Sequence, residues 1–359
     1  MANERYYDQF NREKYEKFNE ILDGLPYFCN EYFTGIDMRT SVLTKLNYAT
    51  DLAIFFDFLV HKVRGFISKQ VVDITLKDLD EYITVTEIEY FLRYLSYYSF
   101  NGKPYRNGEK AKARKLSAVR SLFKYFYNKD KLKENVTAKV ATPKLHEKPI
   151  IRLDDYEVEK MLDTVEAEGK FVSKFQNSYN LNTRDRDIAI VTLFLGTGIR
   201  VSELVGISVE DLDLPNRAFK ITRKGGNMSV LYFSGEVQDA LEVYLDWREQ
   251  RLLKADLLDK ENALFISLQN KRITVRAVEN LVKKYTGVVN PLKSVSPHKL
   301  RSTYGTALYR QTKDIYMVAE VLGHRDVNTT KKHYAAMDED IKREASTKVV
   351  LRKNDGFVE

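Results

Sequence analysis

The chain has 359 residues, of which 43% are hydrophobic and 30% are charged, and its formal net charge is +7. This length exceeds the size at which one hydrophobic core usually stops growing, so we expect two domains. No stretch approaches the roughly 18 uninterrupted apolar residues of a membrane span, and the charged, aromatic N-terminus is unlike a secretory signal. We therefore expect a globular protein of the cytoplasm with no membrane partner.

The single cysteine, Cys29, cannot form a disulfide within the chain. The sequence also lacks the repeated Cys and His spacing of a zinc site, so we expect no metal. We interpret Cys29 as a buried thiol that packs like a small apolar residue.

The first third of the chain is predicted to be helical. Residues 40–63 and 80–98 both place apolar side chains at helical spacings. The clearest helix covers residues 116–127, and its apolar stripe consists of Leu116, Val119, Leu122, Phe123 and Phe126. Arg120 and Lys124 lie four residues apart on another face, so this helix can pack inward while it presents cations outward.

Positive charge is concentrated in one segment of the chain. Residues 101–152 contain fifteen Lys and Arg against four Asp and Glu, a local charge of +11, which leaves −4 for the rest of a chain whose total is +7. A surface that meets phosphates needs such a concentration, because each neutralised phosphate releases condensed counterions. The alternative is a solvated basic linker.

Residues 132–152 lose the helical periodicity and contain Pro143 and Pro149, which are incompatible with a continuing helix. We interpret this segment as an interdomain linker. A helical pattern resumes at Asp154, and residues 186–195 predict a buried helix that is stopped by two glycines, Gly196 and Gly198.

The second domain is predicted to mix helices and strands. Residues 218–223 and 228–233 favour two short strands, and the paired glycines between them allow the positive φ values of a tight hairpin. Helices are expected at 235–253 and 274–286, with a short strand at 263–267 between them.

The last pair of helices is predicted to begin at Ser296, which suits an N-cap, with Pro297 at the first helical position. His298 and Arg301 then lie one turn apart near a helix N-terminus. Free N–H groups and partial positive charge make such an end suitable for a phosphate.

Six side chains in this half of the chain carry chemistry: Arg200, Lys224, His298, Arg301, His324 and Tyr334. Each has an ordinary structural interpretation when it is taken alone, such as a capping ion pair between Arg200 and Glu203. Together they match one reaction, in which a tyrosine hydroxyl displaces an oxygen at a phosphodiester. Guanidiniums bind the nonbridging oxygens, histidines donate hydrogen bonds or handle the nucleophile's proton, a lysine protonates the departing 5′ oxygen, and the phenol becomes the covalent carrier.

The order Arg, Lys, His-x-x-Arg, Gly-His and Tyr resembles that of the tyrosine recombinases, also called the phage integrase family. The resemblance is carried by GTGIRVSELVGI, ITRKGG, SPHKLRSTYGTALY and LGHRDVNTTKKHY. Upstream, LSAVRSLFKYFY is similar to the family's last core-binding helix and TDLAIFFDFL to its first, so the resemblance covers about residues 40–340. The layout is most similar to that of Xer-type enzymes, particularly the single-recombinase XerS kind.

The resemblance implies a mainly α protein of two domains. An N-terminal helical (SAM-like) core-binding domain would occupy residues 1–131, followed by a basic linker at 132–152. An α+β catalytic domain with a small β-sheet would occupy 153–338. The tail, 339–359, would dock either on a neighbouring protomer or on its own domain.

The resemblance also implies the roles of the site residues. Tyr334 would be the nucleophile, and the activating residues would be Arg200, Lys224, His298, Arg301 and His324, with Glu203 supporting Arg200. Family members need neither metal nor ATP, because the phosphotyrosine conserves the energy of the broken bond. The expected partner is double-stranded DNA with an inverted-repeat site, bound by two protomers per site and four in the synapse. The predicted DNA-binding residues are Lys110, Lys112, Arg114, Lys115, Arg120 and Lys124.

Two positions depart from the Xer pattern. Ser302 stands where Xer enzymes usually carry a histidine, and Tyr334 lies ten residues beyond His324, one more than the commonest Xer spacing. Tyr316 is interpreted as a packing residue and His333 as a bystander.

The sequence is compatible with several hypotheses about the biological role. Chromosome dimer resolution is the first, and an integrase or invertase of a mobile element or phase-variable locus is the alternative. A type IB topoisomerase and a DNA-binding regulator with a vestigial site are further alternatives.

Overall fold

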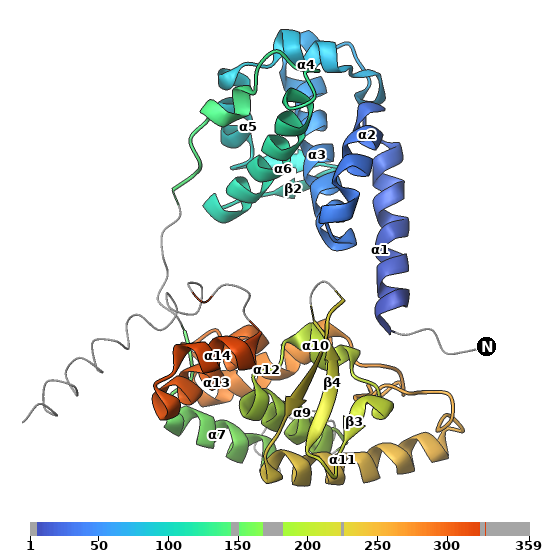
Figure 1. Cartoon of the computed structure of the whole chain (residues 1–359), viewed down its shortest axis with the longest axis vertical. Helices are drawn as coiled ribbons and strands as arrows, with labels where there is room; N and C mark the ends of the chain where they lie inside the picture. Colours follow the sequence, from blue (N-terminus) through green and yellow to red (C-terminus); the bar gives the residue numbers. More distant parts are fainter. Residues whose placement is uncertain (1–5, 145–150, 168–181, 224–225, 324–326, 328–359) are drawn as a thin grey trace, which may run out of the picture. The chain divides into compact units, whose positions relative to one another are not determined.

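The computed structural model describes residues 6–144, 151–167, 182–223, 226–323 and 327. The chain divides into two compact units, Met1–Lys148 and Pro149–Glu359 (Figure 1). No helix in these described ranges is long and apolar enough to cross a membrane.

The first unit is built from helices and one small hairpin. Its elements are α1 (Tyr6–Asp23), α2 (Phe28–Ile36), α3 (Val42–Lys62), α4 (Leu76–Tyr82), α5 (Val85–Tyr94), β1 (Tyr98–Phe100), β2 (Lys103–Tyr105), α6 (Glu109–Tyr127) and the short helical turn η4 (Val136–Lys139). Helix α3 packs against both α1 and α6, which confirms the helix predicted at 40–63. All five residues of the apolar stripe in 116–127 are buried, and so is the free thiol of Cys29. Both predictions are therefore confirmed.

The single helical segment predicted at 80–98 is wrong in detail. A new helix, α5, begins because the Thr84 and Glu87 side chains form a reciprocal capping box. A hairpin follows, because Asn101 and Gly102 both adopt positive φ between β1 and β2.

The segment after α6 packs with the first unit. Leu132 and Val140 are buried in its core, and Arg120 donates hydrogen bonds to the carbonyls of Thr137 (3.2 Å) and Val140. The division between the two units falls later, at Lys148 and Pro149, inside the range predicted as a linker.

The second unit surrounds a buried helix. Its described elements are α7 (Asp155–Glu166), α9 (Arg184–Thr197), α10 (Val201–Gly206), β3 (Leu212–Asp213), β4 (Ala218–Thr222), β5 (Met228–Tyr232), α11 (Gly235–Lys254), α12 (Val275–Val289), α13 (Pro297–Thr312) and α14 (Ile315–Leu322). Helix α9 packs against α7, α11 and α13. The three strands form an antiparallel sheet with β4 in the middle, where Ala218 lies opposite Tyr232 and Thr222 opposite Met228. The predicted hairpin is confirmed to within one residue at each strand.

Two local predictions for this unit need correction. Helix α9 continues through Gly196 and ends at Thr197, and its C-cap Gly198 adopts φ +61°. The strand predicted at 263–267 is instead a segment with isolated bridges. The Tyr244 hydroxyl donates to the Leu264 carbonyl (2.9 Å) and accepts from the Ile266 N–H (3.0 Å), so a side chain satisfies backbone groups that a neighbouring strand would otherwise satisfy.

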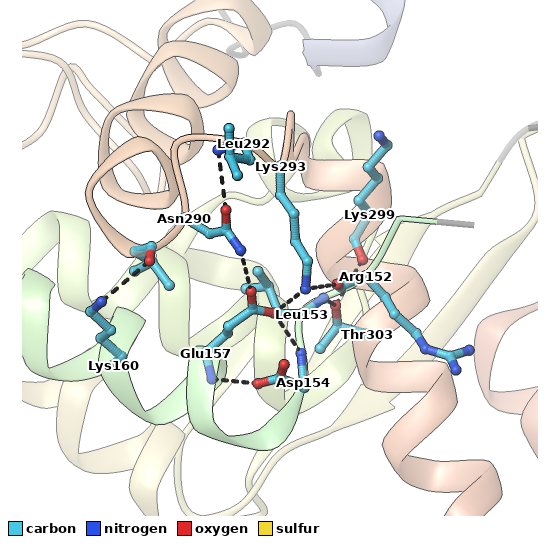
Figure 2. A network of polar contacts seen from close by, with 11 residues as sticks. Arg152, Leu153, Asp154, Glu157, Lys160, Asn290, Leu292, Lys293, Lys299 and Thr303 are labelled. Carbon is cyan, nitrogen blue, oxygen red and sulfur yellow. Dashed lines mark hydrogen bonds and ion pairs between the residues drawn. The ribbon is translucent and has the colours of Figure 1, made fainter. Parts of the chain in front are cut away.

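A buried carboxylate holds α7 to the loop that precedes α13 (Figure 2). Glu157 accepts hydrogen bonds from the Asp154 N–H (2.9 Å), Asn290 Nδ2 (2.8 Å) and Lys293 Nζ (2.5 Å). The Leu153 N–H adds a bond to Thr303 Oγ1 (3.0 Å) on α13 itself. Glu157 therefore ties α7 to the loop, and Thr303 ties the segment before α7 to α13.

Candidate active site

Three arginines from different segments converge on the C-terminal turn of α14. They come from the N-cap of α10, from the residue after β4 and from the second turn of α13, and they donate to three consecutive backbone carbonyls. The pairs are Arg200 with Gly323 (3.3 Å), Arg223 with Val321 (3.3 Å) and Arg301 with Leu322. Carbonyls at a helix C-terminus lack partners within the helix and carry partial negative charge, so cationic donors suit them.

Arg200 is oriented by a buried glutamate. Its side chain keeps 32% of its surface exposed, whereas that of Glu203 keeps only 3%. Glu203 accepts from Arg200 Nη1 through Oε1 (2.7 Å) and from the Arg200 backbone N–H through Oε2 (3.0 Å). One carboxylate thus fixes both the start of α10 and the direction of the guanidinium, which leaves part of that cation open to solvent.

Arg301 is buried, with only 5% of its surface exposed. Its Nη1 donates to the Gly198 carbonyl (2.6 Å), and its Nη2 donates to the Leu322 carbonyl. A Cβ added at Gly198 would lie 2.4 Å from the Tyr304 ring, in a backbone conformation that side chains rarely adopt. Glycine at this position therefore lets the end of α9 approach α13 closely enough for Arg301 to join two helix ends.

His298 lies on the exposed side of the first turn of α13. It follows Ser296 and Pro297, which occupy the predicted N-cap and first helical positions, although the Ser296 side chain makes no capping bond. The Ser302 hydroxyl, at the position that departs from the Xer pattern, donates to the His298 carbonyl (3.2 Å) within the helix.

The described residues include only part of the predicted catalytic set. Arg200, Glu203 and Arg301 meet at the end of α14, while Lys224, His324 and Tyr334 lie outside the described residues, as do His333 and the tail at 339–359.

Tyr316 is not the packing residue expected from the sequence, because it is 71% exposed. The buried side of α14 is formed instead by Val318, Ala319 and Leu322.

Sequence reasoning did not single out Arg223. Its Nε is buried and has no hydrogen-bond partner among the residues that the structure describes. Burial lowers the pKa of Arg223, the nearby charge of Arg200 lowers it further, and Glu203 opposes both effects. The only available signal was its place directly before Lys224 at the end of a predicted strand.

The six predicted DNA-binding cations of α6 differ in their surroundings. Lys110 and Lys124 are exposed. Lys112 pairs with Glu109 (3.2 Å), and Arg120 binds the backbone carbonyls described above. Arg114 and Lys115 both pair with one carboxylate.

That carboxylate is Asp51, which is fully buried on α3 and lies 2.5 Å from Arg114 and 3.3 Å from Lys115. Lys115 is itself buried, whereas the Arg114 side chain is about half exposed. Lys110, Arg114 and Lys124 are therefore the members of the set with the freest access to a ligand, and Lys115 and Arg120 have partners within the fold.

Comparison with known proteins identifies relatives over most of the chain. A model described as the phage integrase family matches residues 152–340. The chain is 34% identical over 341 residues to "Tyrosine recombinase XerC" of Caldanaerobacter subterraneus subsp. tengcongensis, covering 92% of this chain and 87% of the relative. It is 30% identical over 349 residues to "Tyrosine recombinase XerS" of Lactococcus lactis subsp. cremoris, covering 91% and 96%.

Solved structures show the same architecture. The XerH site-specific recombinase bound to a palindromic difH substrate, in a post-cleavage complex, matches with a TM-score of 0.64 at 18% identity, over 85% of this chain and 80% of that one. A lambda integrase dimer bound to a COC′ core site matches with a TM-score of 0.57 at 16% identity, over 85% and 93%. At these identities the likeness shows a shared fold.

The predicted fold class is thereby confirmed: a mainly α chain with an N-terminal helical domain and a C-terminal α+β catalytic domain. The family match covers more than half of the chain, and the relatives are matched over almost their whole length. The chain belongs to the phage integrase family and is a tyrosine recombinase.

Proposed function

We propose that this recombinase is an Xer-like enzyme that cleaves and rejoins duplex DNA at a specific site through a 3′-phosphotyrosine on Tyr334. The observation that carries the proposal is the meeting of Arg200 and Arg301, from α10 and α13, at the end of α14 directly before His324. Two guanidiniums at one point match the nonbridging oxygens of a phosphodiester. Glu203 supports this assignment, since it orients the more exposed guanidinium.

In the proposed reaction the Tyr334 phenol oxygen attacks phosphorus and forms the P–O(Tyr) bond while the bond from phosphorus to the 5′ oxygen breaks. His324 handles the proton of the phenol, and Lys224 gives a proton to the departing 5′ oxygen. Arg200 and Arg301 exchange their carbonyl acceptors for phosphate oxygens and stabilise the developing charge. His298, at the N-terminus of α13, donates to the same phosphate.

The second half of the reaction reverses these bonds. The free 5′ hydroxyl of the partner strand attacks the phosphotyrosine, the tyrosine leaves with its proton restored, and one strand exchange yields a Holliday junction. The second pair of strands then exchanges in the same way. Because each phosphotyrosine conserves the energy of the bond it replaces, the residues of the chain suffice for the chemistry.

The proposed substrate is double-stranded DNA with an inverted-repeat site, bound by two protomers, with four in the synapse. The XerH relative is described on a palindromic substrate, which supports a site of two half-sites. Backbone contacts by α6 are assigned to Lys110, Arg114 and Lys124, because these cations are the most accessible of the predicted set. If the substrate is chromosomal DNA, the enzyme acts in the cytoplasm, which is the location we propose.

We place a core-binding domain at residues 1–131 and a catalytic domain at 153–338, and we assign the tail at 339–359 to docking on a neighbouring protomer. Truncation after Asp338 tests the tail. It should weaken assembly on DNA in gel-shift titrations while leaving the melting temperature of the monomer unchanged. Unchanged assembly would return the tail to its own domain.

Chromosome dimer resolution is the proposed biological role, supported by the matched length of the XerS and XerC relatives. A mobile-element integrase remains the second candidate, because the Tn1549 transposon integrase shares the fold, with a TM-score of 0.59. Plasmids that carry two copies of a genomic inverted repeat, in direct or inverted orientation, distinguish resolution from inversion. Relaxation of any supercoiled plasmid without a recombinant product would indicate a topoisomerase instead.

Tyr334→Phe tests the central step, and Tyr316→Phe, at an exposed tyrosine of α14, is its matched control. The first variant should bind the site but form no covalent protein–DNA adduct on a denaturing gel, and the control should form it at the parental rate. An adduct with Tyr334→Phe would remove this residue as the nucleophile. A regulator with a vestigial site would form no adduct even as the parent protein.

A further inference from the structure

Arg223 closes the loop between β4 and β5 through its backbone. Its N–H donates to the Asn227 carbonyl (2.8 Å), and its own carbonyl accepts from the Gly226 N–H (3.0 Å). These two bonds fix the base of the loop immediately before Lys224. Arg223 is therefore the residue that closes the connection on the side of β4.

The Arg223 side chain holds that base against the end of α14. Its Nη2 donates to the Val321 carbonyl (3.3 Å), and its guanidinium covers Gly323. A Cβ added at Gly323 would lie 1.1 Å from Arg223 Nη1, and the residue adopts φ +59°. Glycine at position 323 is thus what allows the guanidinium to reach the helix end.

The charges around Arg223 connect it to the other two arginines at this helix end. Its guanidinium is half-buried beside that of Arg200, and Glu203 is the carboxylate that attracts both. Burial lowers the pKa of Arg223, and the attraction of Glu203 outweighs the repulsion of Arg200. Glu203 therefore helps to hold two of the three guanidiniums that converge on the end of α14.

We propose that Arg223 is a positioning residue for strand cleavage, because it anchors the base of the β4–β5 loop to the same helix end on which Arg200 and Arg301 converge. This inference rests on the proposed function, in which Lys224 protonates the departing 5′ oxygen. Loss of Arg223 leaves both phosphate-binding arginines in place but releases the loop that carries the proton donor. The defect should therefore concern the leaving group and spare the charge on the nonbridging oxygens.

A change of leaving group tests this directly. In the test substrate, the scissile 5′ bridging oxygen of a DNA duplex is replaced by sulfur, so the leaving group is a thiolate. A thiol is far more acidic than an alcohol, with a pKa of about 8.5 for the cysteine side chain. The thiolate can therefore leave without a proton donor. Arg223→Ala should slow single-turnover cleavage of the ordinary substrate by about 100-fold, at the low end of general acid catalysis. On the sulfur substrate it should fall within about 5-fold of the parent, because little proton transfer remains to be lost.

Two companion variants make the outcome decisive. Lys224→Ala should show the same rescue by sulfur, and if it does not, the lysine role in the proposed function is wrong. If Lys224→Ala is rescued while Arg223→Ala is equally slow on both substrates, the positioning role of Arg223 is wrong. Arg251→Ala removes another half-buried guanidinium of this unit, which donates to the Leu268 carbonyl (2.6 Å), and it should cleave both substrates at parental rates.

A further substitution guards against loss of folding. Arg223→Lys keeps the charge and most of the length but offers a flexible point donor in place of a planar fork. It should give an intermediate defect on the ordinary substrate and full rescue on the sulfur substrate, at an unchanged melting temperature. An intermediate defect that persists on sulfur would contradict the inference.

Discussion

Replacement of Glu203 by glutamine should impair this enzyme in two separable ways. The carboxylate is buried and accepts two hydrogen bonds from one residue, the Arg200 backbone N–H and Arg200 Nη1. A glutamine of the same shape offers one oxygen and one NH₂ group. One of the two Arg200 donors would then face another donor.

The size of both effects follows from the bond that is lost. A hydrogen bond to a charged group contributes about 1.5–3 kcal/mol, so we expect Glu203→Gln to lower the free energy of unfolding by about 2 kcal/mol. If the orientation of Arg200 is needed in the transition state, a similar free energy is lost there, and single-turnover cleavage should slow by about 10- to 100-fold. A nicked substrate whose short 5′ fragment diffuses away after cleavage isolates this step.

Glu157→Gln is the matched control. Glu157 is also buried, also occupies the N3 position of a capping box, and also accepts a backbone N–H, here from Asp154, together with side-chain donors. Its loss should destabilise the unit to a similar degree, whereas it contacts none of the three arginines. Comparable slowing of cleavage by both variants, at a temperature where both are folded, would refute the orientation role of Glu203.

The remaining predictions concern charge. Arg301→Ala should raise the activation free energy of cleavage by about 3 kcal/mol, which slows cleavage roughly 100-fold. Near-normal cleavage of the nicked substrate would exclude a role of Arg301 at the phosphate. Replacing Lys110 and Lys124 by glutamine should reduce the slope of log K against log[salt] by about 0.9 for each lost phosphate contact, and equal slopes for variant and parent would restore the reading of a solvated basic segment. Burial disfavours the ionised form of Glu157, but hydrogen bonds from Lys293, the Asp154 N–H and Asn290 outweigh it and lower the pKa from 4.5 to about 2. Its stabilising effect is therefore complete above pH 4.5 and lost as the pH falls toward 2, so thermal melts of parent and Glu157→Gln should converge across that window.

Local signals predicted the parts of the fold that local physics decides. The stripe of 116–127 and the β4–β5 hairpin follow from side-chain periodicity and glycine conformations within a few residues. The pair of Arg200 and Glu203, three residues apart, could be suspected for the same reason.

Contacts between distant segments were beyond such signals. The charge run in α6 gave no reason to separate Lys115 from Lys124, because the deciding partner of Lys115 is Asp51 on α3. The strand predicted at 263–267 does not form, because the Tyr244 hydroxyl, on α11, makes hydrogen bonds with the backbone groups of this segment.

Arg223 is the clearest case of a functional candidate that only the fold reveals. In the sequence it is one more cation beside a turn lysine. In the structure it lies against the end of α14, where its Nη2 donates to Val321 and its guanidinium covers Gly323. No spacing rule links a residue after β4 to a carbonyl almost a hundred positions later.

The three helix-end carbonyls explain how the arginines can be held in place and still be available to a phosphate. A buried guanidinium such as that of Arg301 needs hydrogen-bond acceptors, because an unpaired buried charge is costly. Neutral carbonyls provide them at fixed positions, but a phosphate carries negative charge and can accept two parallel hydrogen bonds from one guanidinium. On the proposed mechanism the exchange from carbonyl to phosphate is therefore favourable for Arg200 and Arg301. Arg223 donates to the Val321 carbonyl, one residue before the carbonyl that Arg301 binds. This bond can keep the end of α14 in place while Arg200 and Arg301 bind the DNA.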